Sequence, residues 1–142
     1  MHSPVLFLDF DGVLHPNLSM PGQRMVKAPL LADALSGLDV LIVISSSWRF
    51  HPRLGDMLAP WREDLRRRVI GVTADAHMGQ HARWHEIDAY ARTHGVTNWR
   101  ALDDAVFDFP QACAELIACE GSQGLGLRQV AALKRWLGAT SG

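Results

Sequence analysis

The chain has no long hydrophobic run and very few cysteines. Its longest apolar stretches are far shorter than the roughly 20 residues that cross a bilayer, so we expect no membrane-spanning helix and no membrane partner. The N-terminus does not show the basic and then apolar order of a secretory signal. Cys113 and Cys119 are the only cysteines, and their spacing matches neither a zinc pair nor a disulfide framework. We therefore expect a reducing, cytoplasmic location.

An excess of positive charge is also missing, since the formal net charge is -1. Proteins that bind nucleic-acid backbones over a broad surface usually carry a clear excess of Lys and Arg. No lysine lies between Lys27 and Lys134, and the arginine-rich stretch at 62–68 is typical of a solvated helix end. The remaining composition, 48% hydrophobic and 20% charged, is that of a globular protein, and 142 residues fit one domain over 1–142. The oligomeric state stays open.

Short apolar runs alternate with stretches of helical spacing along the chain. Expected strands cover residues 5–10, 40–44, 68–72, 100–102 and 115–119. Expected helices cover residues 29–38, 53–67, 82–93, 110–114 and 127–137. The alternation predicts an α/β fold: a single Rossmann-like three-layer domain with a five-stranded parallel sheet between helices.

Three of the expected strands end in unusually polar residues. They are Asp9-Phe10-Asp11-Gly12, Ser45-Ser46-Ser47 and Asp103-Asp104. In open α/β sheets, ligands bind beyond the carboxyl ends of the strands. We therefore expect the functional site at this edge.

Four carboxylates brought together at one edge repel one another unless a cation neutralises them, and oxygen ligands suit Mg²⁺. Asp9 and Asp11 are two residues apart, so in a continuous strand they face the same side, and Gly12 lets the backbone bend away afterwards. One carboxylate can then attack a phosphoryl group while the other handles the proton. The serines add donors suited to the transferring phosphoryl group. This pattern favours Mg²⁺-dependent phosphoryl transfer.

The run DFDGVL at residues 9–14, the apolar strand ending in Ser45 and the apolar strand ending in Asp103-Asp104 resemble motifs one, two and four of the haloacid dehalogenase (HAD) superfamily. The resemblance implies a phosphatase with Asp9 as nucleophile, Asp11 as acid/base and Ser45 as phosphate-binding hydroxyl. It also implies that Mg²⁺ lies among Asp9, Asp11, Asp103 and Asp104, with Asp11 binding through its carbonyl.

The third motif of this superfamily, a Lys or Arg that steadies the phosphoryl-aspartate, is the hardest to assign. Arg83 is our first choice, because RWHEI at 83–87 resembles a stretch of small HAD domains associated with RNA repair and polynucleotide phosphatases. Arg49 is the alternative cation. Gly12, Ser46, Trp48 and Arg49 are the candidate substrate contacts.

Fewer than thirty residues separate the first two expected strands, so no large cap domain fits between them. In the superfamily such a cap usually encloses small substrates. We therefore expect an open site and a bulky phosphorylated substrate, such as an RNA or DNA end or a phosphoprotein.

Two other functions remain open. A receiver-like domain also phosphorylates an Asp beside Mg²⁺, but its acidic pair follows the first strand, whereas here the pair comes late. A catalytically weak or silent HAD-fold binding module is the second. His77, His81 and His85 have helical spacing but span Gly79, and we interpret them as exposed histidines at a helix start rather than zinc ligands.

Overall fold

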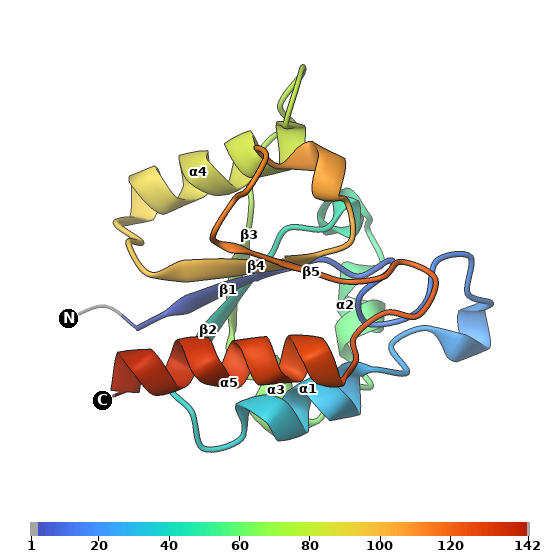
Figure 1. Ribbon diagram of the computed structural model, residues 1–142. Coiled ribbons are helices and arrows are strands. Elements are labelled where there is room, and N and C mark those ends of the chain that lie inside the picture. Colours follow the sequence, from blue (N-terminus) through green and yellow to red (C-terminus); the bar gives the residue numbers. More distant parts are fainter. Residues whose placement is uncertain (1–2, 142) are drawn as a thin grey trace.

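Five parallel strands form the centre of the computed structural model, which describes residues 3–141 (Figure 1). They are β1 (Val5–Leu8), β2 (Leu41–Ile44), β3 (Val69–Val72), β4 (Trp99–Asp103) and β5 (Leu116–Ala118). Their spatial order is β3-β2-β1-β4-β5, so the strand order reverses between β1 and β4. The predicted five-stranded parallel sheet is confirmed.

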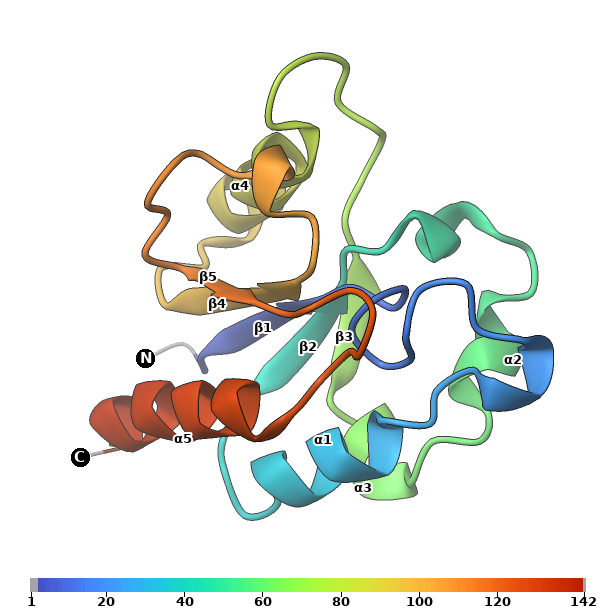
Figure 2. The same ribbon diagram turned by 45° about the vertical axis from the view of Figure 1, so that its right-hand side comes forward.

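Helices cover both faces of this sheet. Figures 1 and 2 show α4 (Ala82–His94) over one face and α1 (Ala28–Leu35), α3 (Glu63–Arg66) and α5 (Leu127–Ser141) over the other. The shorter elements are α2 (Leu54–Leu58) and the 3-10 helices η1 (Pro21–Gln23), η2 (Ser47–Phe50) and η3 (Val106–Asp108). The predicted three-layer α/β arrangement is therefore confirmed.

Strand β1 is buried on both faces, as its uninterrupted apolar sequence predicts. Leu6 and Leu8 belong to the core cluster on the α1 and α5 side, and Val5 and Phe7 belong to the cluster on the α4 side. Complete burial of such a side chain stabilises the fold by about 1.5–3 kcal/mol. The end of β1, where Asp9 follows, is thus anchored by packing on two sides.

The expected single helix over 53–67 is wrong, because α2 ends at Leu58 and α3 begins at Glu63. Pro60 lies between them, and a proline has no backbone N–H to donate to a helical hydrogen bond. The break lets the Trp61 side chain, only 3% exposed, pack edge-on against Phe10 at a centroid distance of 6.0 Å.

The expected helix over 110–114 is also wrong. The helical turn lies earlier, at η3, and residues 110–114 form turns in which Ala112 has a left-handed φ of 58°. The chain must reverse here, because Ala101 donates a backbone hydrogen bond to Glu115 at 2.9 Å as β5 starts to pair with β4.

The connection between β1 and β2 holds only η1 and α1, so within residues 3–141 no large cap domain is inserted there. The expected absence of a large cap is confirmed. None of the helices over 3–141 combines the length and the apolar character that spanning a membrane requires.

Candidate functional site

Polar residues stand side by side where neighbouring strands end. Backbone hydrogen bonds of 3.0–3.1 Å continue the sheet past its last strand residues and connect Thr73, Ser45 and Asp9 to the strands beside them. Following the strand order, the row runs Thr73, Ser45, Asp9, Asp103. Asp9 and Asp103 flank the point where the strand order reverses, which is where open α/β sheets bind their ligands.

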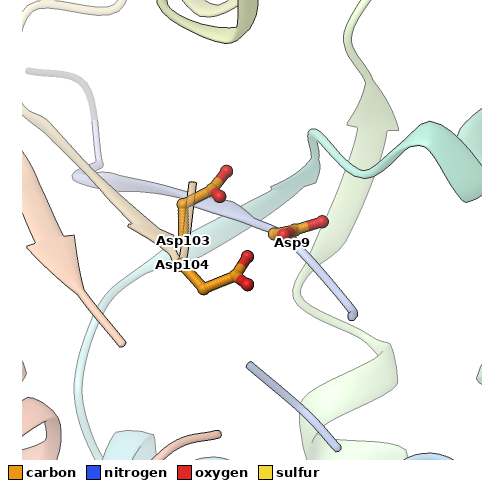
Figure 3. Close-up of side chains that lie close together, drawn as sticks. All are labelled: Asp9, Asp103 and Asp104. Atoms are coloured by element: carbon orange, nitrogen blue, oxygen red, sulfur yellow. The ribbon is translucent and has the colours of Figure 1, made fainter. Parts of the chain in front are cut away.

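Three carboxyl groups converge at this point. Oxygens of Asp9, Asp103 and Asp104 all lie within 4.8 Å of one another, and Figure 3 shows the three side chains grouped at the ends of β1 and β4. Asp9 is 6% exposed and Asp103 is fully buried. Within residues 3–141 this is the only group of three or more acidic, His or Cys side chains close enough to share a metal ion.

Arg83, in the first turn of α4, reaches into this acidic cluster. Its Nη1 atom lies 2.8 Å from Oδ2 of Asp103, to which it donates a hydrogen bond, and 3.4 Å from Oδ1 of Asp9. Only 14% of the Arg83 side chain is exposed. The structure therefore brings Arg83 to the carboxylates, and a single guanidinium bridges both.

The acidic cluster holds more negative charge than Arg83 neutralises. Burial, and then the charge of Asp103, raises the pKa of Asp9 well above its ordinary value, although Arg83 acts in the opposite direction. Burial also raises the pKa of Asp103, again against Arg83. Burial and the same carboxylates raise the pKa of the Cys119 thiol to about 12, so this cysteine stays protonated and is no nucleophile.

Arg49 has a different position. It is 8% exposed, and its Nη2 atom donates to Oε1 of Glu86 at 3.0 Å. Its other nitrogens donate to the backbone carbonyls of Ser45, Ser46, Thr73 and Ala74. Arg49 therefore ties the residues after β2 to those after β3, and these contacts use its donors within the protein.

Glu86 lies between the two arginines. Its Oε1 atom is 3.8 Å from Nε of Arg83 as well as 3.0 Å from Arg49, and its Oε2 accepts a hydrogen bond from the backbone of His77 at 3.0 Å. In this connected array four carboxylates face two guanidiniums, which leaves two negative charges when all are ionised: Asp9, Asp103, Asp104 and Glu86 against Arg49 and Arg83. A divalent cation matches that remainder.

Two glycines let the chain pass close to Asp104. Gly12 has a φ of 78°, and a Cβ atom there would lie in overlap with Oδ2 of Asp104. A Cβ on Gly121 would overlap the same oxygen and the amide of Asn17, which donates to Oδ2 of Asp104 at 3.0 Å. Gly12 therefore shapes the acidic side of the site, in addition to any contact with substrate.

Asp11 lies apart from the acidic cluster, with 51% of its side chain exposed. His15 Nδ1 accepts a hydrogen bond from the Met25 amide at 3.1 Å, so the proton of the neutral ring is on Nε2 and donates to Oδ1 of Asp11 at 2.7 Å. Trp48 Nε1 donates to Oδ2 of Asp11 at 3.0 Å. Both carboxylate oxygens are thus held by neutral donors.

The serines after β2 differ from one another. Ser45 is fully buried, and its hydroxyl has no hydrogen-bond partner among residues 3–141; the same is true of the hydroxyl of Thr73. Buried hydroxyls normally find a partner, so these two suit a bound ligand. The Ser46 hydroxyl instead accepts a hydrogen bond from the Trp48 backbone at 3.1 Å and caps η2.

Sequence reasoning missed four polar residues of this site: His15, Asn17, Thr73 and Glu86. Thr73 had a signal, because it follows an expected strand as Ser45 does. Glu86 had one too, since it is three residues after Arg83 and lies on the same helix face. His15 and Asn17 had none, because their contacts depend on how the loop after β1 folds back.

The three regularly spaced histidines do not form a metal site within the described part of the chain. α4 begins at Ala82, as the sequence predicts, and His81 precedes it with a left-handed φ of 56°. The rings of His77 and His85 stack at 4.3 Å.

Comparison with known families gives one match over most of the chain. The family model described as "HAD domain in Swiss Army Knife RNA repair proteins" matches residues 5–130. No match was found among curated proteins.

Proposed function

We propose that this chain, which belongs to the family of HAD domains in Swiss Army Knife RNA repair proteins, is a Mg²⁺-dependent phosphohydrolase that works through an aspartyl-phosphate. The observation that carries the proposal is the buried acidic cluster at the sheet's switch point, with Arg83 2.8 Å from Asp103 and 3.4 Å from Asp9. The family match is consistent with this assignment, and it is independent of the site geometry because it comes from the sequence.

The donor set suits Mg²⁺. Three carboxylates with oxygens within 4.8 Å supply hard oxygen ligands, and the connected array around them is short of two positive charges. Asp9 and Asp104 are the better placed direct ligands, because Asp103 already accepts hydrogen bonds from Arg83 and from the Ala105 backbone at 2.8 and 2.9 Å. When bound, Mg²⁺ would neutralise the phosphoryl oxygens and help to orient them.

The protein's own groups then divide the chemistry. A carboxylate oxygen of Asp9 attacks phosphorus, the bond to the leaving oxygen breaks, and that oxygen takes a proton from Asp11. In the second step Asp11 takes a proton from a water molecule that attacks the phosphoryl group and frees Asp9. Arg83 and the buried hydroxyl of Ser45 stabilise the charge on the transferring group.

The substrate we propose is a phosphorylated RNA end. Within residues 3–141 no large cap covers the site, so a bulky substrate can approach it. The matched family is named for RNA repair, and broken RNA ends carry terminal phosphates that a phosphohydrolase removes. A DNA end or a phosphoprotein is the alternative that the experiment must separate.

The test is phosphate release by the wild type and by Asp9→Asn, with Mg²⁺ and with EDTA. Substrates are para-nitrophenyl phosphate, RNA and DNA oligonucleotides with 3′ or 5′ phosphates, and phosphopeptides. We expect Mg²⁺-dependent release that is greatest with an RNA end and absent in Asp9→Asn. Undiminished release by Asp9→Asn contradicts the mechanism. Tight RNA binding without release on any substrate would instead identify a silent binding module.

A further inference from the structure

A groove of about 620 Å³ opens beside Trp48. Its volume lies within the range of about 300–1,000 Å³ typical of ligand sites. The lining comes from η1 and the residues after it, from η2 and its C-terminal side, and from α2, and it includes Pro21, Arg24, Trp48, His51, Arg53 and Met57. The acidic cluster contributes none of the lining residues, so this groove is distinct from the metal side of the site.

Trp48 connects the groove to the chemistry. Its indole nitrogen donates to Asp11 at 3.0 Å, and its side chain lines the groove. If Asp11 protonates the leaving oxygen, the leaving group must lie against Asp11 while the phosphoryl group lies at Asp9. The remainder of the substrate therefore leaves the reaction centre on the side where the groove begins.

The groove offers planar groups for stacking. The guanidinium of Arg24 lies 5.0 Å from the centroid of the Trp48 ring, and the ring of His51 lies 4.8 Å from it. Unpaired nucleic-acid bases stack on aromatic rings and on arginine planes, at about 1–3 kcal/mol per base. Met57 and Pro21 add apolar surface to the lining.

The groove also offers a cation that no carboxylate neutralises. Arg53 pairs with Asp56 at 3.0 Å, whereas exposed Arg24 has no carboxylate within salt-bridge distance among residues 3–141. The charge of Arg24, which lies over the Trp48 ring, is thus uncompensated and can attract a phosphate group. A planar ring beside an uncompensated arginine can contact both parts of a nucleotide, the base through the ring and the phosphate through the guanidinium.

We propose that this groove, here called the Trp48 groove, binds the terminal nucleoside of single-stranded RNA. The end phosphate lies at Asp9, the base packs against the planar groups around Trp48, and the next phosphodiester lies at Arg24. The inference rests on the proposed function, because that function places the leaving group beside Asp11.

The first experiment measures binding without turnover. In the Asp9→Asn background, fluorescence anisotropy follows a labelled pentaribonucleotide with a 3′ or a 5′ phosphate. We expect Arg24→Gln to weaken binding about tenfold, the effect of losing one stacked and charged contact. The slope of log affinity against log salt should shrink by about 0.7, as for one phosphate contact on a single strand.

A second groove supplies the matched control. It has about 820 Å³, lies along β5 and α5, and is lined by Arg128 and Arg135, both exposed. Arg135→Gln removes the same charge as Arg24→Gln and should leave RNA affinity and the salt slope unchanged. An equal loss in both variants would show unspecific attraction, and a loss in Arg135→Gln alone would place the RNA in the second groove. Either result overturns the proposal.

A kinetic experiment separates this inference from the proposed function. Para-nitrophenyl phosphate has no second phosphate for Arg24, so Arg24→Gln in the otherwise wild-type chain should turn it over normally. With a phosphorylated RNA end its kcat/KM should fall about tenfold. If the wild type releases phosphate from none of these substrates, the proposed function fails, and the anisotropy result still decides on the groove. The groove assignment is contradicted if the wild type and Arg24→Gln have equal kcat/KM on the RNA end. It is also contradicted if Arg24→Gln lowers kcat/KM more on a phosphopeptide than on the RNA end.

Discussion

Two carboxylates from the same short run have opposite surroundings. Asp9 is 6% exposed and stands among buried charges, with Asp103, Asp104 and Arg83 around it. The side chain of Asp11, two residues later, is 51% exposed and is held only by neutral donors. Gly12 directs the chain away immediately afterwards.

The difference indicates a division of labour. A buried carboxylate among other carboxylates suits a nucleophile whose charge is balanced by an arginine and by a bound metal ion. An exposed carboxylate suits a group that must exchange a proton with a leaving alcohol and with water. The same chemical group can therefore perform two roles because its environment, and not its side chain, differs.

Among variants that keep Asp9, the largest expected effect comes from removing Asp11, the proposed proton donor. Asp11→Asn should lower steady-state turnover of para-nitrophenyl phosphate by a factor of about 10²–10⁴. Because nitrophenolate leaves without help from an acid, Asp9 should still be phosphorylated, and stopped flow should show a burst of one nitrophenolate per enzyme. Asp9→Asn should show no burst. A burst in both variants would mean that the two roles are not divided as proposed.

Arg83→Met tests the buried acidic cluster around Asp9. We expect kcat/KM to fall by a factor of about 10²–10³, as for other groups that stabilise transition-state charge. The loss should be equal for para-nitrophenyl phosphate and for an RNA end, because Arg83 contacts the side of the site common to both. Arg92→Met is the matched control on the same helix, since among residues 3–141 Arg92 pairs with Asp88 alone, at 2.8 Å. An Arg83→Met variant that stays within a few-fold of the wild type, with unchanged circular dichroism, contradicts the assignment.

Mg²⁺ should stabilise the fold in a pH-dependent way. The pKa values of Asp9 and Asp103 are raised above 3.8 in the folded chain, so without metal the folded state holds protons more tightly than the unfolded state. Without metal, the free energy of unfolding therefore falls as pH rises from 3.8 through the raised pKa values. Mg²⁺ binding changes in the opposite direction, because it is lost as pH falls through the same pKa values and the carboxylates become protonated. At a Mg²⁺ concentration one hundred times Kd the gain is about 2.7 kcal/mol. Thermal melts with Mg²⁺ and with NaCl of equal ionic strength should diverge toward neutral pH; a constant difference contradicts the linkage.

The smallest effect is expected from a residue that only positions Asp11. His15→Gln should lower kcat about tenfold, because one of two hydrogen bonds to the carboxylate is lost or displaced, at about 1.4 kcal/mol. In the first step, transfer of the phosphoryl group to Asp9, the defect should be greater for an RNA end than for para-nitrophenyl phosphate. The RNA leaving oxygen needs a proton from Asp11, whereas nitrophenolate leaves without one. His94→Gln, on the far end of α4, is a control for histidine removal. An equal loss of the first-step rate on both substrates would indicate a structural role for His15.

The sequence predicts the sheet and its polar edge well, because buried strands are short apolar runs and strand ends fall where polarity begins. Asp9, Ser45 and Asp103 follow from that pattern. The choice between Arg49 and Arg83 does not, since both lie near the edge and only their contacts in the folded chain differ. Arg83 lies against Asp9 and Asp103, whereas Arg49 donates to Glu86 and to backbone carbonyls. The helix predicted over 53–67 is two helices in the structure, because Pro60 cannot donate the backbone hydrogen bond that would continue the first.

The close approach of Gly12 and Gly121 to Asp104 has a consequence for related domains. A single methyl group at either glycine would push Asp104 from its place while leaving all the acidic side chains in the sequence. A related domain could therefore keep every aspartate of the site in its sequence and still be inactive. When enzymes are to be separated from inactive copies by reading sequences, these two glycines should be weighed together with the aspartates.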